Sequence, residues 1–374
     1  MKDKKRIAIF AEKLYGGGVE KILQIVCRNF DYNRYDLTLY ASRVEKHPQG
    51  TYPEHLRIKY FFDSGNGFIT RMKNKLRLFV YYHFSPSIYY RLFIREKYDV
   101  GIAFIEGYAT RFLSGAPKRM KKIAWLHTDI ENNHWTDVAY HGRDEEKACY
   151  QLYDKIVCVS SVVKKKAQEI LGVENTIVLH NPIETTIIEE LSKLSVKNDE
   201  GKVRIVSIGS LIPVKGYDRL IRVVRRLKDE HEPIELFILG EGHERKSLED
   251  LIEENNLGDI ISLLGFVDNP YPILRSTDIY VCSSYAEGFN TAITEALVLG
   301  RAIVSTEISG VREQLGEDGE YGIITENSED GIFQGLKRMI ENGNIEHYQQ
   351  KAMIRGREFN LETQMQKIYN VIES

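Results

Sequence analysis

Two glutamates carry the chemistry that this sequence offers most clearly. Glu287 and Glu295 lie eight positions apart, across a polar turn and an apolar, helix-like run. Carboxylates in such a place can accept hydrogen bonds from a ligand. From the residues alone, the alternative is that both acids are solvated and Glu287 only stabilises a helix dipole.

The stretch from Asp278 to Thr306 predicts the elements that hold these acids. Four successive elements are expected: a buried strand, a polar turn, a helix and a second apolar strand, at 279–282, 283–288, about 289–299 and 302–305. Gly300 is a typical helix stop. We therefore expect the turn to place Glu287 at the mouth of the helix, with Glu295 on the helix itself and both acids facing one cleft.

Length and charge indicate two domains. The chain has 374 residues, of which 43% are hydrophobic, and this exceeds what a single core comfortably supports. Residues 1–180 contain 30 Lys and Arg against 20 Asp and Glu, whereas the whole chain has a net charge of -3. The two halves thus differ in sign, which favours a boundary near residue 185 and a first half that attracts anionic partners.

Composition also indicates the compartment. Glu12 and Lys13 interrupt the first apolar run, which is too short for a signal peptide, and no stretch reaches the roughly 18 to 20 apolar residues of a membrane-spanning helix. Four cysteines lie far apart without a CxxC pair: Cys27, Cys149, Cys158 and Cys282. We expect reduced core cysteines in a cytoplasmic protein, rather than metal or redox sites.

A glycine turn near the N-terminus could bind phosphate. A strand over 6–11 is followed by Gly16, Gly17 and Gly18 and then by a helix from about Val19. Free backbone N–H groups at such a helix start can hold a phosphate. The alternative is a tight turn that merely needs positive φ. The pattern is not the GxGxxG fingerprint, so it gives little support to a nicotinamide enzyme.

Polar residues also follow two later strands of the first half. Glu106 follows a strand over 99–105, while His127 and Asp129 follow a strand over 122–126. Loops at the carboxyl ends of parallel strands bind ligands in open α/β sheets. His127 is a candidate for contacting a sugar or phosphate, although a lone histidine is often structural. Glu106 and Asp129 are further candidates for contacting a ligand at these loops.

Residues 71–98 mix basic and aromatic side chains. This mixture suits a helix pair that lies on an anionic bilayer. The alternative is a pair of ordinary helices, broken at Pro86, with the rings in the core and the charges in solvent. Nucleic-acid binding uses the same mixture, but no nucleic-acid module surrounds the segment, so we expect no nucleic-acid partner.

The second half alternates strands and helices. Strands are expected at 203–209, 235–239 and 260–264, after a polar segment over 184–202 that reads as a linker or a surface helix. This alternation predicts an α/β fold with a doubly wound parallel sheet.

Taken in order, these signals resemble the retaining glycosyltransferases of family 4, which have the GT-B fold, over nearly the whole chain. EGFNTAITE resembles the E-x7-E signature of that family, and Lys215-Gly216 matches its phosphate loop. Gly16–Gly18 resembles its N-terminal glycine loop, and His127 stands where the family keeps a histidine facing the donor sugar. The resemblance implies two Rossmann-like doubly wound domains that face a central cleft.

The resemblance also implies domain limits and residue roles. An acceptor-binding domain would span 1–184 and a nucleotide-sugar-binding domain 185–355, with a helix in 356–374 crossing back to the first domain. The implied catalytic residues are His127, Lys215 and Glu287. Glu287 would contact hydroxyls of the donor sugar, Glu295 those of the ribose, and Lys215 the diphosphate. Glu106 and Asp129 would lie on the acceptor side. The implied donor-binding residues are Gly17, Gly18, Ser210, Lys215, Phe266, Val267, Glu287, Gly288, Phe289, Asn290, Thr291 and Glu295.

Two positions depart from the family pattern. Ser210 stands where the family usually has an arginine that grips the donor diphosphate, and serine supplies no charge. Asn290 replaces the usual small residue. No two aspartates are separated by one residue, so the DxD metal motif is absent and neither metal nor cofactor is expected.

We therefore expect an enzyme that moves a sugar from a UDP- or GDP-sugar to a glycan acceptor. The acceptor would be lipid-linked, in surface polysaccharide or glycolipid synthesis on the inner face of the cell membrane. Two alternatives remain: a GT-B nucleotide-sugar epimerase, and a nucleotide-sugar-binding protein that has lost catalysis.

Overall fold

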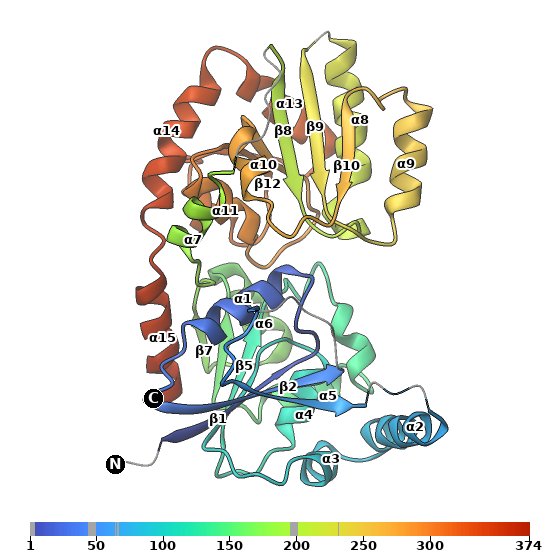
Figure 1. Ribbon diagram of the computed structural model, residues 1–374, viewed down its shortest axis with the longest axis vertical. Helices are drawn as coiled ribbons and strands as arrows, with labels where there is room; N and C mark the ends of the chain where they lie inside the picture. The colour runs from blue at the N-terminus through green and yellow to red at the C-terminus, as the bar shows by residue number, and fades with distance from the viewer. Residues whose placement is uncertain (1–3, 44–49, 64, 66, 195–200, 231) are drawn as a thin grey trace. The chain divides into compact units, whose positions relative to one another are not determined.

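The chain forms two compact units, each built on one parallel sheet (Figure 1). The computed structural model describes residues 4–43, 50–63, 65, 67–194, 201–230 and 232–374. The first unit comprises Met1–Asn181 and Glu362–Ser374, and the second comprises Pro182–Leu361.

The first unit has a seven-stranded sheet in the order β3-β2-β1-β4-β5-β6-β7. Its strands are β1 (Lys5–Ala11), β2 (Tyr35–Arg43), β3 (Arg57–Phe62), β4 (Val100–Ala103), β5 (Lys121–Leu126), β6 (Lys155–Cys158) and β7 (Thr176–Val178). All neighbours are parallel, and Ile7 of β1 pairs with Leu37 of β2 on one side and with Val100 of β4 on the other. Strand order therefore reverses between β1 and β4, which is where such sheets usually bind ligands.

Helices cover both faces of this sheet, as the doubly wound class requires. They are α1 (Gly18–Arg28), α2 (Phe68–His83), α3 (Pro86–Phe93), α4 (Tyr108–Ser114), the 3-10 turn η1 (Trp135–Ala139), α5 (Arg143–Tyr150) and α6 (Ser161–Leu171). Local sequence sets their ends. At α6, for example, the Ser160 hydroxyl accepts a hydrogen bond from Val163 N, and Gly172 ends the helix in the left-handed region.

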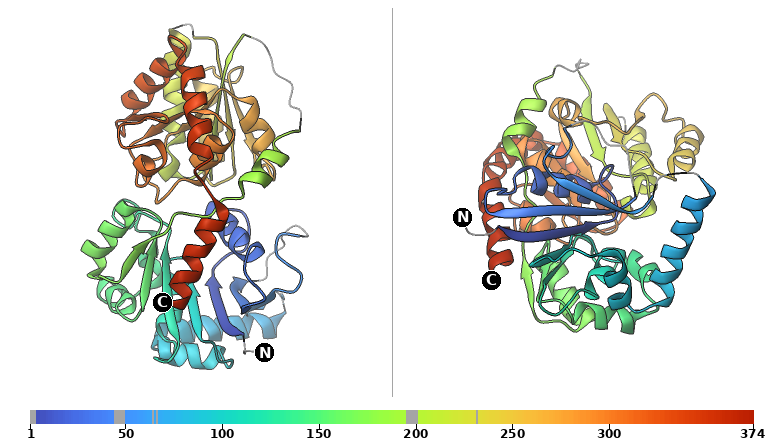
Figure 2. Two further views of the ribbon diagram at one scale, coloured as in Figure 1. Left: turned by 90° about the vertical axis from the view of Figure 1, so that its left-hand side faces the viewer. Right: turned by 60° about the horizontal axis from the view of Figure 1, so that its bottom comes forward.

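The last helix of the chain, α15 (Leu361–Glu373), packs on the first unit at the starts of its strands (Figure 2). Tyr369 stacks on Tyr35, which begins β2, with ring centroids 5.6 Å apart. Glu373 forms an ion pair with Lys5 of β1 at 2.5 Å. The C-terminal helix thus packs at the amino ends of the strands, opposite to the carboxyl ends at which such sheets usually bind ligands.

The second unit has a six-stranded parallel sheet in the order β10-β9-β8-β11-β12-β13. Its strands are β8 (Val203–Ile208), β9 (Ile234–Leu239), β10 (Ile261–Gly265), β11 (Ile279–Cys282), β12 (Ala302–Thr306) and β13 (Ile323–Thr325). Ile279 and Val281 join one core cluster, whereas Tyr280 and Cys282 join another. Since successive side chains point to opposite faces, the sheet is buried on both sides.

The helices of the second unit complete these two cores. They are α7 (Thr185–Leu191), η2 (Pro213–Lys215), α8 (Tyr217–Asp229), α9 (Arg245–Glu254), α10 (Tyr271–Ser276), α11 (Thr291–Val298), α12 (Val311–Leu315), α13 (Glu329–Ile340) and α14 (Asn344–Gly356). Part of the segment expected as a linker is α7, whose Ile188 is buried in the core. Residues 195–200 of that segment lie outside the described residues.

The helix expected over 289–299 is shorter than predicted. It begins at Thr291 because Asn290 has extended backbone angles and caps it, and it ends at Val298 before the left-handed Gly300. All four cysteines are buried and unpaired in disulfides, as their apolar surroundings indicated.

Candidate functional site

The centre of the candidate site is an ion pair between Lys215 and Glu287 in the second unit. Lys215 ends the turn η2 after β8, and Glu287 lies in the loop after β11. β8 and β11 are neighbours and are the pair at which strand order reverses. Lys215 Nζ donates to Glu287 Oε1 at 2.5 Å. The sheet topology therefore brings together two residues that lie 72 positions apart, at the edge where a ligand is expected.

Three donors converge on one oxygen of Glu287. Besides Lys215, Ser284 Oγ donates to Oε1 at 2.7 Å and Asn290 Nδ2 donates to it at 3.2 Å. Within the part of the chain that the structure describes, no donor reaches Oε2. The side chain of Glu287 is 14% exposed. Glu287 is thus held through one oxygen only.

The charge of Lys215 is maintained by its partner. Burial disfavours the protonated amine, but the adjacent Glu287 carboxylate outweighs burial and raises the pKa of Lys215. A cation next to a partly open carboxylate can bind the phosphate and a hydroxyl of one ligand.

Asn290 both caps α11 and orients Glu287. Its Oδ1 accepts a hydrogen bond from Ile293 N at 3.2 Å, while its amide nitrogen reaches Glu287. Gln314 Nε2 donates to the Asn290 carbonyl at 2.7 Å and to Thr294 Oγ1 at 2.8 Å. The asparagine that departs from the family pattern therefore has a structural reason in this chain.

Gly216 allows the lysine loop to approach the glutamate loop. It has φ of +63°, and a Cβ there would lie 2.4 Å from the Ser283 carbonyl oxygen. Ser283 Oγ also donates to the Lys215 carbonyl at 2.9 Å. The glycine after Lys215 is thus required by both its backbone angles and its close neighbour.

Arg219 is part of this support and sequence reasoning missed it. Its Nε and Nη2 donate to the Ser283 carbonyl at 2.9 and 2.6 Å, and Nη2 also donates to Asn327 Oδ1. The guanidinium stacks on the Tyr285 ring, 3.8 Å from its centroid. A single arginine near the start of a helix gives no sequence signal for such a buried role.

Ser210 follows β8 and is half-buried. Its backbone lies against the 240–242 loop: a Cβ at Gly240 would lie 1.9 Å from the Gly209 carbonyl oxygen. Arg219, the next arginine after Ser210 along the chain, is bound to Ser283 and Asn327 and does not take the place of the missing arginine. Lys215 is therefore the cation that this loop offers.

The other predicted donor residues surround the same edge at different depths. Glu295 is on the second turn of α11 and is 3% exposed, so it lies deeper than Glu287. Phe289 is buried, whereas Phe266, after β10, is half exposed. Gly288 is buried, Thr291 begins α11, and Val267 packs against the core.

In the first unit, His127 and Glu106 meet at the ends of β5 and β4. The His127 backbone N–H donates to Glu106 Oε2 at 3.0 Å. The imidazole lies against Trp125 and Phe104, and among the described residues its two nitrogens have no hydrogen-bond partner of good geometry. Burial lowers the pKa of His127 to about 3, although the Phe104 backbone offsets part of this shift. The ring is therefore neutral at pH 7.

Two carboxyl groups with raised pKa values accompany this histidine. Desolvation raises the pKa of Glu106, whose Oε1 also lacks a partner among the described residues. Glu12, which follows β1, accepts a hydrogen bond from Tyr108 N at 3.3 Å, and burial raises its pKa to about 7. Sequence reasoning missed Glu12, although its place after a strand was the available signal.

Two predicted residues have local partners instead of an open face. Asp129 is buried and binds Lys166 Nζ at 2.9 Å and Asn132 Nδ2 at 2.8 Å, so it holds its own loop. At the glycine turn, a Cβ on Gly17 would lie 2.3 Å from the Glu20 carboxylate. Gly18 begins α1. The Glu20 carboxylate therefore occupies the space beside this helix start, and it must move before a phosphate can bind there.

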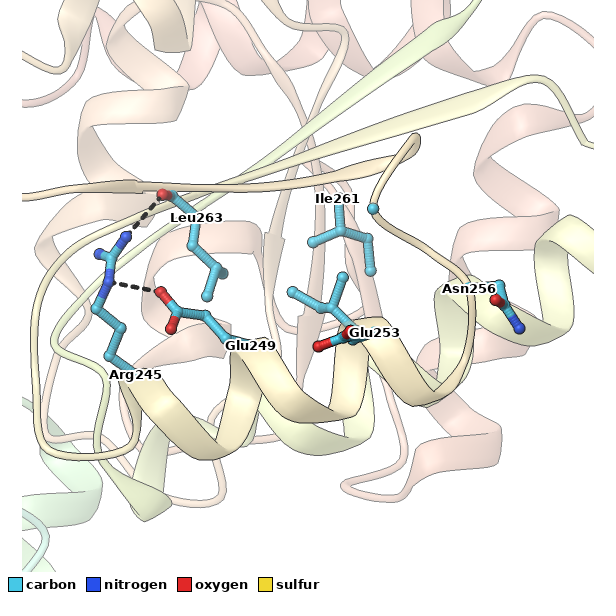
Figure 3. A pocket seen from close by; sticks show the side chains of 8 residues that line it. Arg245, Glu249, Glu253, Asn256, Ile261 and Leu263 are labelled. Atoms are coloured by element: carbon cyan, nitrogen blue, oxygen red, sulfur yellow. Dashed lines mark hydrogen bonds and ion pairs between the residues drawn. The ribbon is translucent and has the colours of Figure 1, made fainter.

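The structure also contains a polar cluster and a surface hollow that sequence reasoning did not predict. His134, Asp137 and Glu146 have ligand atoms within 4.8 Å of one another, and His134 Nε2 is 2.8 Å from Glu146 Oε2. The hollow between α9 and the edge strand β10 is lined by Arg245, Glu249 and Leu263, among others (Figure 3). None of the predicted site residues lines it. Among the described helices, none has both the length and the apolar character needed to cross a bilayer.

Two family models match the chain, one on each half. "Glycosyltransferase Family 4" matches residues 16–187, and "Glycosyl transferases group 1" matches residues 189–356. Together they cover both candidate sites.

Curated relatives match part of the chain. An N-acetylgalactosamine-N,N'-diacetylbacillosaminyl-diphospho-undecaprenol 4-alpha-N-acetylgalactosaminyltransferase of Campylobacter jejuni is 39% identical over 158 residues, which are 41% of this chain and 42% of the relative. A lipopolysaccharide core biosynthesis glycosyltransferase, LpsE, of Rhizobium meliloti is 26% identical over 50% of this chain and 53% of its own. The chain thus spans about half or less of the length of these relatives.

Solved structures share the fold over the full length. Anabaena HepE in complex with UDP and glucose has a TM-score of 0.74 at 17% identity, with 99% of both chains covered. TarM of S. aureus has a TM-score of 0.71 at 14% identity, covering 99% of this chain and all of the other. At these identities the likeness is one of fold.

Proposed function

Because the chain belongs to the family 4 glycosyltransferases, with the GT-B fold, we propose that it moves a sugar from a nucleotide-sugar donor to a glycan acceptor with retention of configuration. The observation that carries this proposal is the Lys215–Glu287 pair at the strand-order reversal. A UDP- or GDP-sugar is the expected donor.

The pair suits the charge changes of such a transfer. When the sugar–phosphate bond breaks, the diphosphate gains negative charge while the anomeric carbon becomes cation-like. Lys215 stabilises the departing diphosphate, and the open oxygen of Glu287 accepts hydrogen bonds from sugar hydroxyls. Glu295 binds the ribose, and His127, as a neutral ring, contacts the donor sugar.

The acceptor is the less constrained half of the proposal. We assign it to the first unit, whose sequence is basic, with Glu106 and Glu12 as the polar groups at the end of its sheet. The relative from C. jejuni acts, by its name, on a diphospho-undecaprenol-linked saccharide, and the relative from R. meliloti serves lipopolysaccharide core synthesis. The first of these names supports a lipid-linked acceptor, and we propose that transfer takes place at the inner face of the cell membrane.

Ser210 favours a second candidate, a nucleotide-sugar-binding protein without turnover. With serine in place of arginine, the loop offers one cation fewer to the diphosphate. Such a protein would bind donor yet transfer nothing to any acceptor, and Ser210→Arg would strengthen its binding.

Thermal unfolding with a panel of UDP-, GDP- and ADP-sugars tests the proposal, because a ligand that binds the folded state raises the melting temperature. At least one sugar nucleotide should stabilise the protein, and the same donor should then be consumed only when acceptor is present. If no nucleotide sugar stabilises the protein, the proposal fails. A changed nucleotide sugar formed without acceptor would indicate an epimerase instead.

A further inference from the structure

Helix α2 has its polar face turned inward. Asn74 exchanges two hydrogen bonds with the backbone of Asp63, at 3.0 and 3.2 Å. Arg77 Nη1 donates to the Phe61 carbonyl at 2.6 Å. Tyr81 is buried and its hydroxyl donates to the Ala139 carbonyl at 3.3 Å. The spacing of four, three and four residues places these side chains, together with Thr70, on one face of the helix.

The opposite face of α2 is apolar and open to solvent. It presents five large side chains at helical spacing: Phe68, Ile69, Met72, Leu76 and Phe79. Phe68 is 81% exposed and Leu76 is 62% exposed. On α3, Ile88 and Leu92 are exposed as well. An ordinary surface helix shows the reverse arrangement, so this face, which we call the outward face, requires a partner.

The surroundings of the outward face are basic. Between Asp63 and Glu96 the sequence contains no acidic residue. The exposed cations there are Arg71, Lys73, Lys75, Arg91 and Arg95. Apolar side chains ringed by cations complement an anionic bilayer, in which headgroups meet the charges and acyl chains meet the apolar groups. A second copy of the same face would bring like charges together.

The two helices are fixed to the body of the first unit. Tyr89 contacts Phe112 of α4 edge to face, with centroids 5.1 Å apart. Tyr90 OH donates to Met120 Sδ at 3.3 Å. A Cβ on Gly115 would lie 2.1 Å from the backbone of Pro86, so α3 and α4 are in direct contact. Together with the contacts of α2 given above, these contacts hold the outward face as a platform on the first unit.

This platform adjoins the end of the sheet that we assign to the acceptor. The Tyr82 and Tyr108 hydroxyls on α2 and α4 are 3.1 Å apart. Tyr108 lies two residues after Glu106, and its backbone N–H donates to Glu12. A surface bound through α2 would thus lie beside the polar groups of the first unit.

From these contacts we propose that the outward face of α2, with Ile88 and Leu92 of α3, docks the protein on an anionic lipid bilayer. Lipid binding by this face does not depend on the proposed function. Only its use in presenting a lipid-linked acceptor rests on that function. The sequence alone suggested that residues 71–98 as a whole could dock on a membrane. The structure limits this set to the side chains that face solvent, because Tyr81, Tyr89 and Tyr90 are core residues. It also adds Phe68, which is exposed on the same face.

Vesicle cosedimentation without any sugar substrate tests the proposal. The full chain should bind vesicles of phosphatidylcholine with phosphatidylglycerol, should bind pure phosphatidylcholine weakly, and should lose affinity as salt rises. Leu76→Ser/Phe79→Ser should reduce the partition coefficient roughly tenfold or more, because two inserted side chains are removed. Both residues are exposed, so the melting temperature should not change.

Leu152→Ser/Ile354→Ser is the matched control, since these residues are apolar and 51% and 54% exposed on other helices or turns. This control should bind vesicles like the unaltered protein. Absence of binding to anionic vesicles, or equal binding by the Leu76→Ser/Phe79→Ser variant, overturns the proposal. The proposal is also overturned if the unaltered protein and the control variant sediment as dimers while the Leu76→Ser/Phe79→Ser variant sediments as a monomer. Nucleotide-sugar binding in lipid-free solution is measured separately, so failure of docking and failure of the proposed function give different results.

Discussion

Lys215 Nζ and Glu287 Oε1 lie 2.5 Å apart, and this contact joins the loops that follow two adjacent strands, β8 and β11. Lys215 alone would attract a phosphate, whereas the charge of Glu287 alone would repel it. Held together, they form a site with one cation and one free carboxylate oxygen, which matches a ligand that carries both a diphosphate and a sugar.

Removing the lysine should weaken diphosphate binding. Lys215→Ala should cost about 1.5 to 3 kcal/mol in affinity for a nucleoside diphosphate, the usual value of a hydrogen bond to a charged group. Titration calorimetry measures this loss. Lys228→Ala, on the exposed surface of α8, is the control and should bind normally. Equal affinity of both variants would reject the role of Lys215.

Asn290 should have two separable effects. Asn290→Ala should lower the free energy of unfolding by about 1 kcal/mol through loss of the helix cap. Asn290→Ser should retain most of that stability, because serine also caps, but should lose the amide contact with Glu287 and weaken donor binding. Urea unfolding and calorimetry distinguish the two. Equal stability of Asn290→Ala and the unaltered protein would contradict the cap.

Gly216 should not tolerate a side chain. Gly216→Ala places a Cβ against the Ser283 carbonyl at positive φ, which should cost about 1 to 3 kcal/mol of stability and displace Lys215. Gly258→Ala is the matched control, because no atom lies within 4 Å of its Cβ position. Thermal unfolding of both variants checks this. Equal melting temperatures would show that the loop can relax.

His127 should make stability depend on pH. Its pKa is about 3 in the folded state and near 6.5 when exposed, so the unfolded chain binds a proton first as pH falls. The stability contributed by neutral His127 is complete above about pH 6.5 and is lost toward pH 3, at about 1.4 kcal/mol per pKa unit at most. Urea unfolding at pH 7.5 and 5.0 should show a smaller decrease for His127→Gln than for the unaltered protein. Exposed His347→Gln should leave the decrease unchanged, and identical decreases in all three proteins would refute the assignment.

The sequence was sufficient for the fold and for the main site pair. Parallel strands follow from apolar runs separated by amphipathic helices. Glu287 stood out in the turn after such a run, and Lys215 stood out because its loop resembles the phosphate loop of the family. The turn chemistry was harder to predict. In the sequence, Asn290 is only a departure from the family pattern. The structure shows that it caps α11 and orients Glu287.

Residues 71–98 show where sequence reasoning reaches its limit. A mixture of rings and cations favours a membrane face or a core equally until the neighbours of each side chain are known. α4 covers Tyr89 and Tyr90, and the backbone before α2 binds Asn74 and Arg77. These side chains therefore face the body of the first unit, and the remaining apolar and basic side chains face solvent. Arg219 and Glu12 depend on contacts from distant loops in the same way.

The rate of sugar transfer by Glu287→Gln tests the central claim most directly, with the donor found in the thermal screen and a lipid-linked saccharide as acceptor. Glutamine preserves the shape of the side chain but removes the charge that pairs with Lys215 and binds the sugar. Transfer should fall by several orders of magnitude while the melting temperature stays near that of the unaltered protein. Transfer at a near-normal rate would contradict the assignment of Glu287 to the donor site.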